Sequence, residues 1–319
     1  MYLTLKTISN QCLQVLGGAA LLWVAMGITG TSHVVFGAEA QHHEKIIISG
    51  ASGKLGGLAV EELLHRGVNP HDLILVTRTP KMLKQYAELG ASVRFGDFTK
   101  PESLPAAYAG GTRMLLISIN MGGDKRISLQ KIAIDAAKRA GVKQIAYTSF
   151  VNMDHNTSPI AHDHRATEAY LKASGVAWTM LRNSIYMDGL VEVAAHMVKA
   201  GRAVIPPHET KIGYVTRADC AAAAAAVLVT PGTEYKAYDI TGPELIGTRE
   251  IAEAASAVSG KPVKIVKGTK DPGGFRLTGD FFSVTSSAVK DLTGRPATSL
   301  RELLQVNKDK FLSESGAGS

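Results

Sequence analysis

The chain has 319 residues, of which 45% are hydrophobic and 20% charged, and its mean hydropathy is +0.05. This composition excludes a disordered protein and is sufficient for a large core, in about two domains of ordinary size. The net charge of +7 comes without any cluster of five or more Lys and Arg residues, which argues against nucleic-acid binding, and two cysteines are too few for a disulfide framework or a thiolate metal site.

The first forty residues differ from the remainder. An almost uncharged run from Leu13 to Val35 is followed by Ala38-x-Ala40, a small-x-small pattern that is typical of a cleavage site. We therefore expect a signal peptide over 1–40 and an exported or periplasmic protein. Two alternatives stay open. The run is close to the roughly 20 residues that span a bilayer, which would make it an uncleaved membrane anchor, and a start codon placed too far upstream would leave the protein cytoplasmic.

From Lys45 onward, short apolar runs alternate with amphipathic stretches. The runs predict strands over 46–49, 73–77, 91–95, 113–118, 143–148 and 176–181. The stretches between them predict helices over 58–66, 81–89, 125–140 and 164–174, which are followed by Gly67, Gly90, Gly141 and Gly175. Strands that are apolar throughout and separated by helices indicate an α/β fold with a Rossmann-like, doubly wound parallel sheet and helices on both faces.

We expect the sheet domain to cover 41–182 and a smaller substrate-binding lobe, interleaved with the sheet, to cover 183–319. The glycine-rich block 268–282 has no clear period and is interpreted as a loop over a site. Helices of the lobe are predicted over 220–229, where Thr216-x-x-Asp219 resembles a capping box, and over 248–259 and 299–312.

The first predicted strand runs directly into a glycine-rich loop that opens the first helix. Glycines at i, i+3 and i+6 allow a tight turn, close approach of backbone N–H groups to a pyrophosphate, and close packing of helix on strand. A glycine-rich turn alone is also found in ordinary strand-to-helix connections, but strand, loop and helix occur here in the order that dinucleotide binding needs. The predicted cofactor-binding residues of this loop are Gly50, Ala51, Ser52, Gly53, Lys54, Leu55 and Gly56.

The end of the second predicted strand indicates which dinucleotide is bound. Arg78 stands where an NAD site would have a carboxylate for the ribose 2′-hydroxyl, and a guanidinium there can bind a 2′-phosphate. NADP(H) is therefore preferred to NAD(H), with an ordinary surface cation as the alternative for Arg78. Asp97 and Phe98, after the third strand, are expected beside the adenine, unless they only form a turn.

Several segments together resemble the NmrA-like atypical short-chain dehydrogenase/reductases, and within that family the NADPH:quinone oxidoreductases and the triphenylmethane-dye and azo-dye reductases. They are GASGKLGG, VTR, GDFxKPESL, IAYTSF, HDHRATE and TMLRN. The resemblance covers roughly 45–312 and implies NADPH as the cofactor. It also implies that Ser118 and the segment from Thr148 to Phe150 line the nicotinamide side, that His164 takes the place of a lysine that is catalytic in plant-type relatives, and that Asn183 to Tyr186 face the substrate.

Ordinary short-chain dehydrogenases use a Tyr-x-x-x-Lys pair to protonate a forming alkoxide. This chain has no such pair, because Tyr147 is followed by Thr-Ser-Phe-Val and Tyr170 by Leu-Lys-Ala-Ser. Reduction of a simple ketone is therefore disfavoured. A quinone or a dye suits the sequence better, since a conjugated system spreads the charge that arrives with a hydride.

The candidate catalytic residues are His164, as a hydrogen-bond donor, and Ser149, to orient an acceptor oxygen. The alternatives are a satisfied, partly buried histidine and a strand-end hydroxyl bonded to its own backbone. No metal site is expected, because the histidine two positions before His164 would lie on another face of a helix. The candidate substrate-facing residues are Phe150, Asn183 and Tyr186.

These observations predict an NADPH-dependent oxidoreductase that transfers a hydride to a quinone or another small conjugated acceptor of the dye or azo type. The alternative is a non-catalytic NADP(H)-sensing regulator, because the missing acid pair suits both. We expect a monomer or homodimer that binds no nucleic acid and meets a membrane only through an uncleaved N-terminal segment.

Overall fold

The computed structural model describes residues 44–269 and 280–314. The predicted signal peptide over 1–40 lies outside these ranges, so the leader and the location of the protein stay predictions. Within the described ranges, no helix is both long and apolar enough to cross a bilayer.

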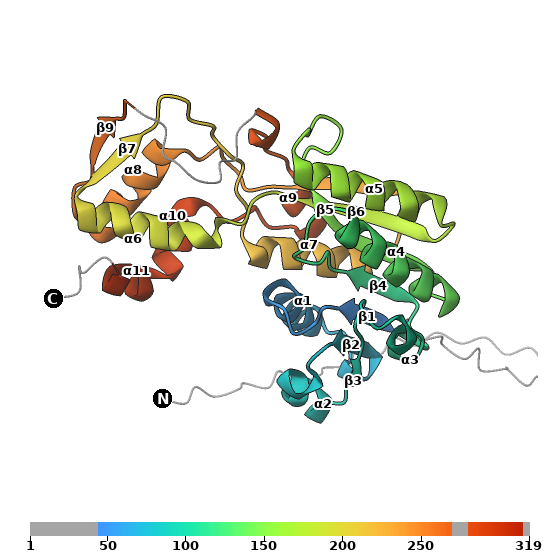
Figure 1. Ribbon diagram of the computed structural model, residues 1–319. Coiled ribbons are helices and arrows are strands. Elements are labelled where there is room, and N and C mark those ends of the chain that lie inside the picture. Colours follow the sequence, from blue (N-terminus) through green and yellow to red (C-terminus); the bar gives the residue numbers. More distant parts are fainter. Residues whose placement is uncertain (1–43, 270–279, 315–319) are drawn as a thin grey trace, which may run out of the picture. The chain divides into compact units, whose positions relative to one another are not determined.

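Seven parallel strands form the main sheet, in the order β3-β2-β1-β4-β5-β6-β8 (Figure 1). Strands β1 to β6 therefore have the order 3-2-1-4-5-6 of a Rossmann fold, in which ligands bind at the carboxyl ends of the strands where the order reverses, here between β1 and β4. The predicted fold class and all six predicted strands are confirmed. The strands are β1 (Ile46–Ser49), β2 (Leu73–Thr77), β3 (Ser92–Phe95), β4 (Arg113–Leu116), β5 (Gln144–Phe150), β6 (Ala177–Asn183) and β8 (Lys236–Ile240).

Helices cover both faces of this sheet, because successive side chains of a strand point to opposite sides. Ile46 and Ile48 lie in the core beneath α1, α2, α7 and α9, whereas Ile47 lies in the core beneath α3, α4 and α5. The helices are α1 (Lys54–His65), α2 (Lys84–Glu88), α3 (Leu104–Tyr108), α4 (Asp124–Arg139), α5 (Pro159–Ala173), α7 (Arg217–Val229) and α9 (Ala288–Thr293). The four glycines predicted to end helices all have positive φ: Gly67, Gly90, Gly141 and Gly175.

Alanine side chains let α7 pack against α1 on one face of the sheet. All six residues from Ala221 to Ala226 are buried. The helix begins at Thr216, whose hydroxyl accepts a hydrogen bond from the Asp219 N–H (3.0 Å), as the spacing of these two residues predicts. Small side chains thereby allow the backbones of the two helices to approach each other.

After β6 the chain divides between the main sheet and a second group of elements. β8, α7 and α9 join the sheet, whereas the second group surrounds a separate core that includes Val191, Ile251 and Leu304 (Figure 1). The domain boundary at 183 stays a prediction. The predicted helix over 248–259 is confirmed, and the one predicted over 299–312 is divided in two. The elements of this group are α6 (Leu190–Ala200), β7 (Arg202–Ile205), α8 (Thr248–Ser259), β9 (Lys264–Lys267), α10 (Leu300–Val306) and α11 (Lys308–Glu314).

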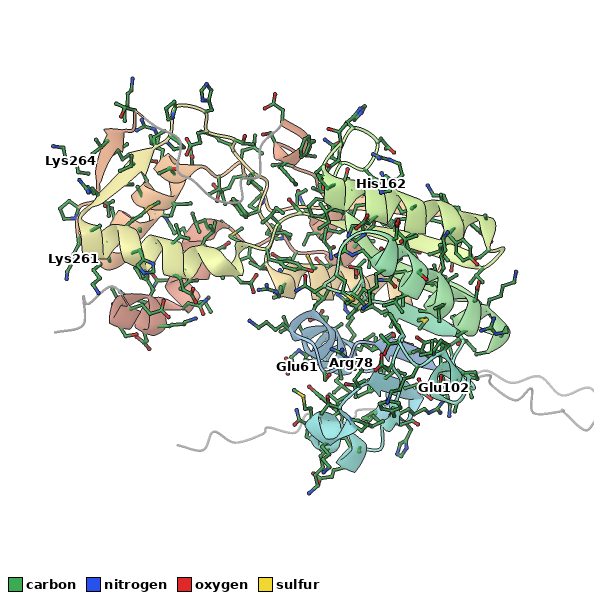
Figure 2. All side chains as sticks on the ribbon, in the orientation of Figure 1. Glu61, Arg78, Glu102, His162, Lys261 and Lys264 are labelled. Carbon is green, nitrogen blue, oxygen red and sulfur yellow. The ribbon has the colours of Figure 1, made fainter. Side chains whose placement is uncertain are left out.

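Helix α5 begins earlier than predicted. Ser158 is its N-cap, with an oxygen that accepts from the Ala161 N–H (3.4 Å), and Pro159 is the first helical residue, where its missing N–H does no harm. The predicted start at 164 was therefore too late. His162 and His164 both lie inside the helix on different faces, as expected: the His162 side chain is 74% exposed (Figure 2), whereas His164 is 3% exposed.

Candidate active site

The loop after β1 turns sharply beneath the first turn of α1. Gly50 has a φ of +94°, which glycine adopts without strain. The N–H groups of Gly50 and Ala51 both donate to the carbonyl of Val76 at the end of β2 (3.0 and 3.1 Å). A Cβ at Gly56 would lie 2.2 Å from the Gly50 carbonyl oxygen, so only glycine lets α1 approach the loop this closely.

The amino end of α1 has the properties of a phosphate site. No side chain caps it, and no acidic residue lies in its first turn. The N–H groups of that turn have no partners within the helix, and the helix dipole adds partial positive charge there. The loop therefore fits the diphosphate of a dinucleotide.

A cavity of about 670 Å³ opens beside this loop at the carboxyl ends of β4, β5 and β6. It brings together segments that are more than a hundred positions apart in the sequence, from Gly50 to Tyr186. All residues predicted for the nicotinamide and the acceptor lie on its wall. The predicted residues that line it are Gly50, Gly53, Lys54, Leu55, Gly56, Ser118, Thr148, Ser149, Phe150, His164, Asn183 and Tyr186.

Other predicted cofactor residues do not line this cavity. Ala51 is fully buried, and the hydroxyl of Ser52 lies 2.6 Å from that of Thr77 at the end of β2. Arg78 is exposed directly after β2 (Figure 2). Its backbone adjoins the phosphate site, because Val76, whose carbonyl anchors the loop, is only two residues earlier in the chain.

Asp97 and Phe98 form a turn after β3. The Asp97 carboxylate accepts hydrogen bonds from the N–H and the hydroxyl of Thr99 (2.9 and 2.8 Å). Burial acts to raise the pKa of Asp97, but the Thr99 bonds and the cations Arg78 and Lys100 outweigh it and lower the pKa. Phe98 is half-buried against the core beneath α3 and α4. The turn expected as the alternative is thus present, and contact of these residues with adenine stays a prediction.

Two hydroxyls join β4 to β5 on the cavity wall. The Thr148 hydroxyl oxygen accepts from the Ser118 N–H (2.8 Å), and the Thr148 hydroxyl donates to the Ser118 hydroxyl oxygen (3.2 Å). Among the described residues, the hydrogen of the Ser118 hydroxyl has no partner of its own. It is therefore free for a bound molecule.

His164 is hydrogen-bonded at both ring nitrogens. Arg126 Nη1 donates to Nε2 (2.9 Å), and Nδ1 lies 2.9 Å from the Tyr147 hydroxyl. Because a guanidinium only donates, Nε2 accepts and Nδ1 carries the ring proton. Burial, and then the charge of Arg126, lower the pKa of His164 to about 3 against the opposing effect of Asp163. The ring is therefore neutral at neutral pH, and its contacts fit the alternative of a satisfied buried histidine.

The hydroxyl proton of Ser149 is already engaged in a hydrogen bond within the protein. It donates to Glu168 Oε1 (2.6 Å), and Arg182 holds both oxygens of that carboxylate through Nε and Nη2 (3.0 Å each). A carboxylate paired in this way only accepts. Ser149 therefore has lone pairs, but no proton, to offer to a molecule in the cavity. It cannot donate to an acceptor oxygen in this arrangement, and its partner is a side chain instead of its own backbone.

Two buried polar atoms at the end of β6 lack partners among the described residues. They are Asn183 Oδ1 and Ser184 Oγ, and both belong to residues on the cavity wall. Such atoms in a native structure require an explanation, and a bound polar ligand is one. Tyr186 lies nearby with its ring over the Arg217 guanidinium (4.4 Å to the centroid), and burial raises the pKa of its hydroxyl.

A second cavity of about 780 Å³ is lined partly by the same residues, Asn120, Arg126 and Ile160. Phe281 and Phe282 also line it, so the end of the block predicted to form a loop over a site does reach a cavity. Residues 270–279 of that block lie outside the described ranges.

Arg126 lines both cavities and was not predicted from the sequence. It is 5% exposed and lies on the buried stripe of α4 with Gln130, Ala133, Ile134 and Ala137. The same helical period, continued toward the start of the helix, places Arg126 among core residues. A cation at a position that the pattern assigns to the core was the signal in the sequence that could have identified it.

We predict that Gly56→Ala abolishes cofactor binding, because its Cβ would meet the Gly50 carbonyl oxygen at 2.2 Å and push α1 away from the loop. The matched control is Gly57→Ala, whose Cβ would have Ala51 oxygen as its nearest neighbour at 4.0 Å. Titration calorimetry with NADPH should show normal affinity for Gly57→Ala and at least about a hundredfold loss, some 2.7 kcal/mol, for Gly56→Ala. Equal affinities would contradict the close approach.

We predict that His164 contributes to acid lability. The unfolded chain protonates this histidine near pH 6.5, whereas the native state resists protonation down to about pH 3. The unfolded state then binds more protons, so the histidine's contribution to the free energy of unfolding falls as the pH decreases from about 6.5, by up to about 1.4 kcal/mol per pH unit.

The measurement is the free energy of unfolding between pH 7 and pH 4. His164→Gln should show a shallower decline than the wild type, and His162→Gln, an exposed position on the same helix, should follow the wild type. A decline that His164→Gln leaves unchanged would show that the histidine titrates normally.

The comparisons with known proteins agree with this geometry. A family model described as NAD(P)H-binding matches residues 50–231. The chain is 35% identical to quinone oxidoreductase 2 of Escherichia coli over 218 residues, which are 68% of this chain and 76% of that protein. It is 26% identical to the NAD(P)H azoreductase of Xenophilus azovorans over 83% of this chain and 99% of that protein.

Solved structures give the same result. The triphenylmethane reductase of Citrobacter sp. in complex with NADP(H) is 30% identical, with a TM-score of 0.74 over 82% of this chain and 99% of that chain. The resemblance inferred from the motifs is thus confirmed. With a cofactor loop that fits a diphosphate and a family model that matches more than half of the chain, the chain belongs to the NAD(P)H-binding, NmrA-like family.

Proposed function

We propose that this protein is an NADPH-dependent oxidoreductase that transfers a hydride to a quinone or another conjugated acceptor. The observation that carries the proposal is the cavity beyond β4, β5 and β6, where a phosphate-binding helix start and an aromatic wall meet in one space. The quinone oxidoreductase and azoreductase relatives support this class of acceptor.

The residues present fit the cofactor. The first-turn N–H groups of α1 would bind the diphosphate, and Arg78 would bind the 2′-phosphate. The unpartnered Asn183 Oδ1 and Ser184 Oγ would accept hydrogen bonds from the nicotinamide end. Bound NADPH supplies a hydride, that is, two electrons and one proton.

The aromatic wall suits a flat acceptor ring. The Phe150 ring is stacked on the imidazole of His164, with centroids 5.9 Å apart and an interplanar angle of 16°. The rings of Phe150 and Phe282 are nearly perpendicular, at 78° with centroids 5.7 Å apart, and Phe282 lines the adjoining second cavity. Flat apolar side chains with a few polar groups are typical of sites for planar conjugated ligands.

Three polar side chains in or beside the cavity wall offer no ready proton to an acceptor at neutral pH: Tyr147, His164 and Ser149. Tyr147 is fully buried, which raises the pKa of its hydroxyl, and His164 is neutral with both nitrogens engaged. The Ser149 hydroxyl already donates its hydrogen bond to Glu168. This set fits an acceptor whose reduced form takes its proton from water after the hydride has arrived. In place of acid catalysis we propose positioning roles, in which His164 holds Arg126 and the Ser149 oxygen accepts a hydrogen bond from a bound molecule.

The test of the function is turnover. Purified protein mixed with NADPH and a panel of quinones, azo dyes and triphenylmethane dyes should oxidise NADPH at about 1–10 per second with its best acceptor, followed by the nicotinamide absorbance. Gly56→Ala protein is the negative control. Binding of NADPH without oxidation by any acceptor would favour the regulator over the enzyme.

Cofactor choice has its own test in Arg78→Ala. Loss of a charge-assisted bond to the 2′-phosphate should weaken NADPH binding by about tenfold to a hundredfold and leave NADH binding within about threefold. Lys81→Ala, which removes an exposed cation three positions further on, should change neither affinity. An equal loss for both dinucleotides would remove the basis for choosing NADP.

A further inference from the structure

Arg126 is a buried cation on the wall of both cavities. Its side chain has five N–H donors. Two of them are used, by His164 Nε2 and by the carbonyl of Ile119 (2.9 Å each). Its Nε is buried and has no partner in the part of the chain that the structure describes. The guanidinium therefore has unused donors beside the space where a ligand binds.

No carboxylate compensates this charge directly. Among the described residues, none lies within the 4.0 Å of an ion pair with Arg126, whereas the other buried arginine of this region, Arg182, is paired with Glu168 at 3.0 Å. Asp163 also lines the second cavity, but its oxygens face the Gly123 N–H (2.6 Å) and the ring of His162 (3.4 Å). An unpaired buried charge is strongly unfavourable, so the arrangement suits a ligand that brings the missing anion.

We propose that Arg126 binds the acceptor oxygen on which negative charge develops, and that it thereby selects quinones over cationic dyes. This inference rests on the proposed function. A quinone that accepts a hydride gains two electrons and one proton and becomes the hydroquinone monoanion, with the charge on a ring oxygen. One proton from water completes the hydroquinone.

The surroundings of Arg126 favour the acceptor over the cofactor as the source of that oxygen. The second cavity contains no residue of the glycine loop, and its wall includes Phe281 and Phe282. The diphosphate already has the start of α1. A cationic triphenylmethane dye would place a second positive charge beside a buried guanidinium, where weak screening makes the repulsion large.

His164 and the Ile119 carbonyl hold the guanidinium in place before the acceptor arrives. A donor that is already oriented toward the developing charge stabilises the transition state without reorganisation. The buried histidine can hold the guanidinium in this way without any proton transfer. His164 is a positioning residue, and Arg126 is the residue that touches the acceptor.

The experiment measures binding to the complex with NADP⁺, in which no turnover occurs. Three ring probes differ in charge: 2-hydroxy-1,4-naphthoquinone, an anion at neutral pH, the neutral 1,4-naphthoquinone, and the cation crystal violet. Titration calorimetry on the wild type should give the anion about tenfold tighter binding than the neutral ring, with the cation weakest. A wild type without preference for the anion would overturn the proposal.

Variants assign the preference to this side chain. Arg126→Met should lose about tenfold in affinity for the anion and keep the neutral ring and NADP⁺ within about threefold, whereas Arg126→Lys should retain part of the preference. Arg139→Met, an exposed arginine on the same helix, is the control for charge and should match the wild type. If Arg126→Met fails to fold, the wild-type order and Arg126→Lys decide.

Two outcomes separate this proposal from others. Weaker binding of NADP⁺ by Arg126→Met, with the order of the three probes unchanged, would assign the arginine to the cofactor and overturn the proposal. An absence of turnover with every acceptor would contradict the proposed function, while the binding order would still report on Arg126.

Discussion

The site depends on one close contact, between the backbone of α1 and the carbonyl of Gly50. Because Gly56 has no side chain, the helix can lie directly on the loop, and its free N–H groups face the carboxyl edge of the sheet. The loop is in turn held by Val76 in the neighbouring strand. On the other side, the alanines of α7 let that helix pack on α1. The phosphate site is thus set by backbone approach, before any specific side chain contributes.

Beyond the loop, the polar residues of the cavity are arranged in two chains. One runs from Arg182 through Glu168 to Ser149, and the other from Arg126 through His164 to Tyr147. In each chain the arginine fixes which atoms donate and which accept. The hydroxyl proton of Ser149 and the ring proton of His164 are therefore both engaged in hydrogen bonds within the protein. Chemistry that requires only orientation and charge stabilisation is compatible with this arrangement, and the missing Tyr-x-x-x-Lys pair continues to disfavour reduction of a simple ketone.

The features that follow from local sequence could be predicted, and those that depend on remote partners could not. Apolar runs predicted six strands of the sheet, and four glycines predicted where helices end. The spacing of the glycines after the first strand predicted the cofactor loop. Strand β8 was missed because it lies at the edge of the sheet, where the exposed Lys236 interrupts the apolar pattern. Ser149 and His164 were recognised as candidate site residues, but the hydrogen bonding of Ser149 is decided by Glu168 of α5 and that of His164 by Arg126 of α4. No local pattern contains that information.

The two oxygens at the end of β6 that lack partners among the described residues affect the stability of the protein. Without a ligand, Asn183 Oδ1 and Ser184 Oγ are buried with no hydrogen-bond partner within 44–269 and 280–314, which lowers the stability of the fold. A dinucleotide that binds only the native state adds stability in proportion to the logarithm of its concentration over its dissociation constant. Resistance to proteolysis should therefore rise with the concentration of dinucleotide around the protein.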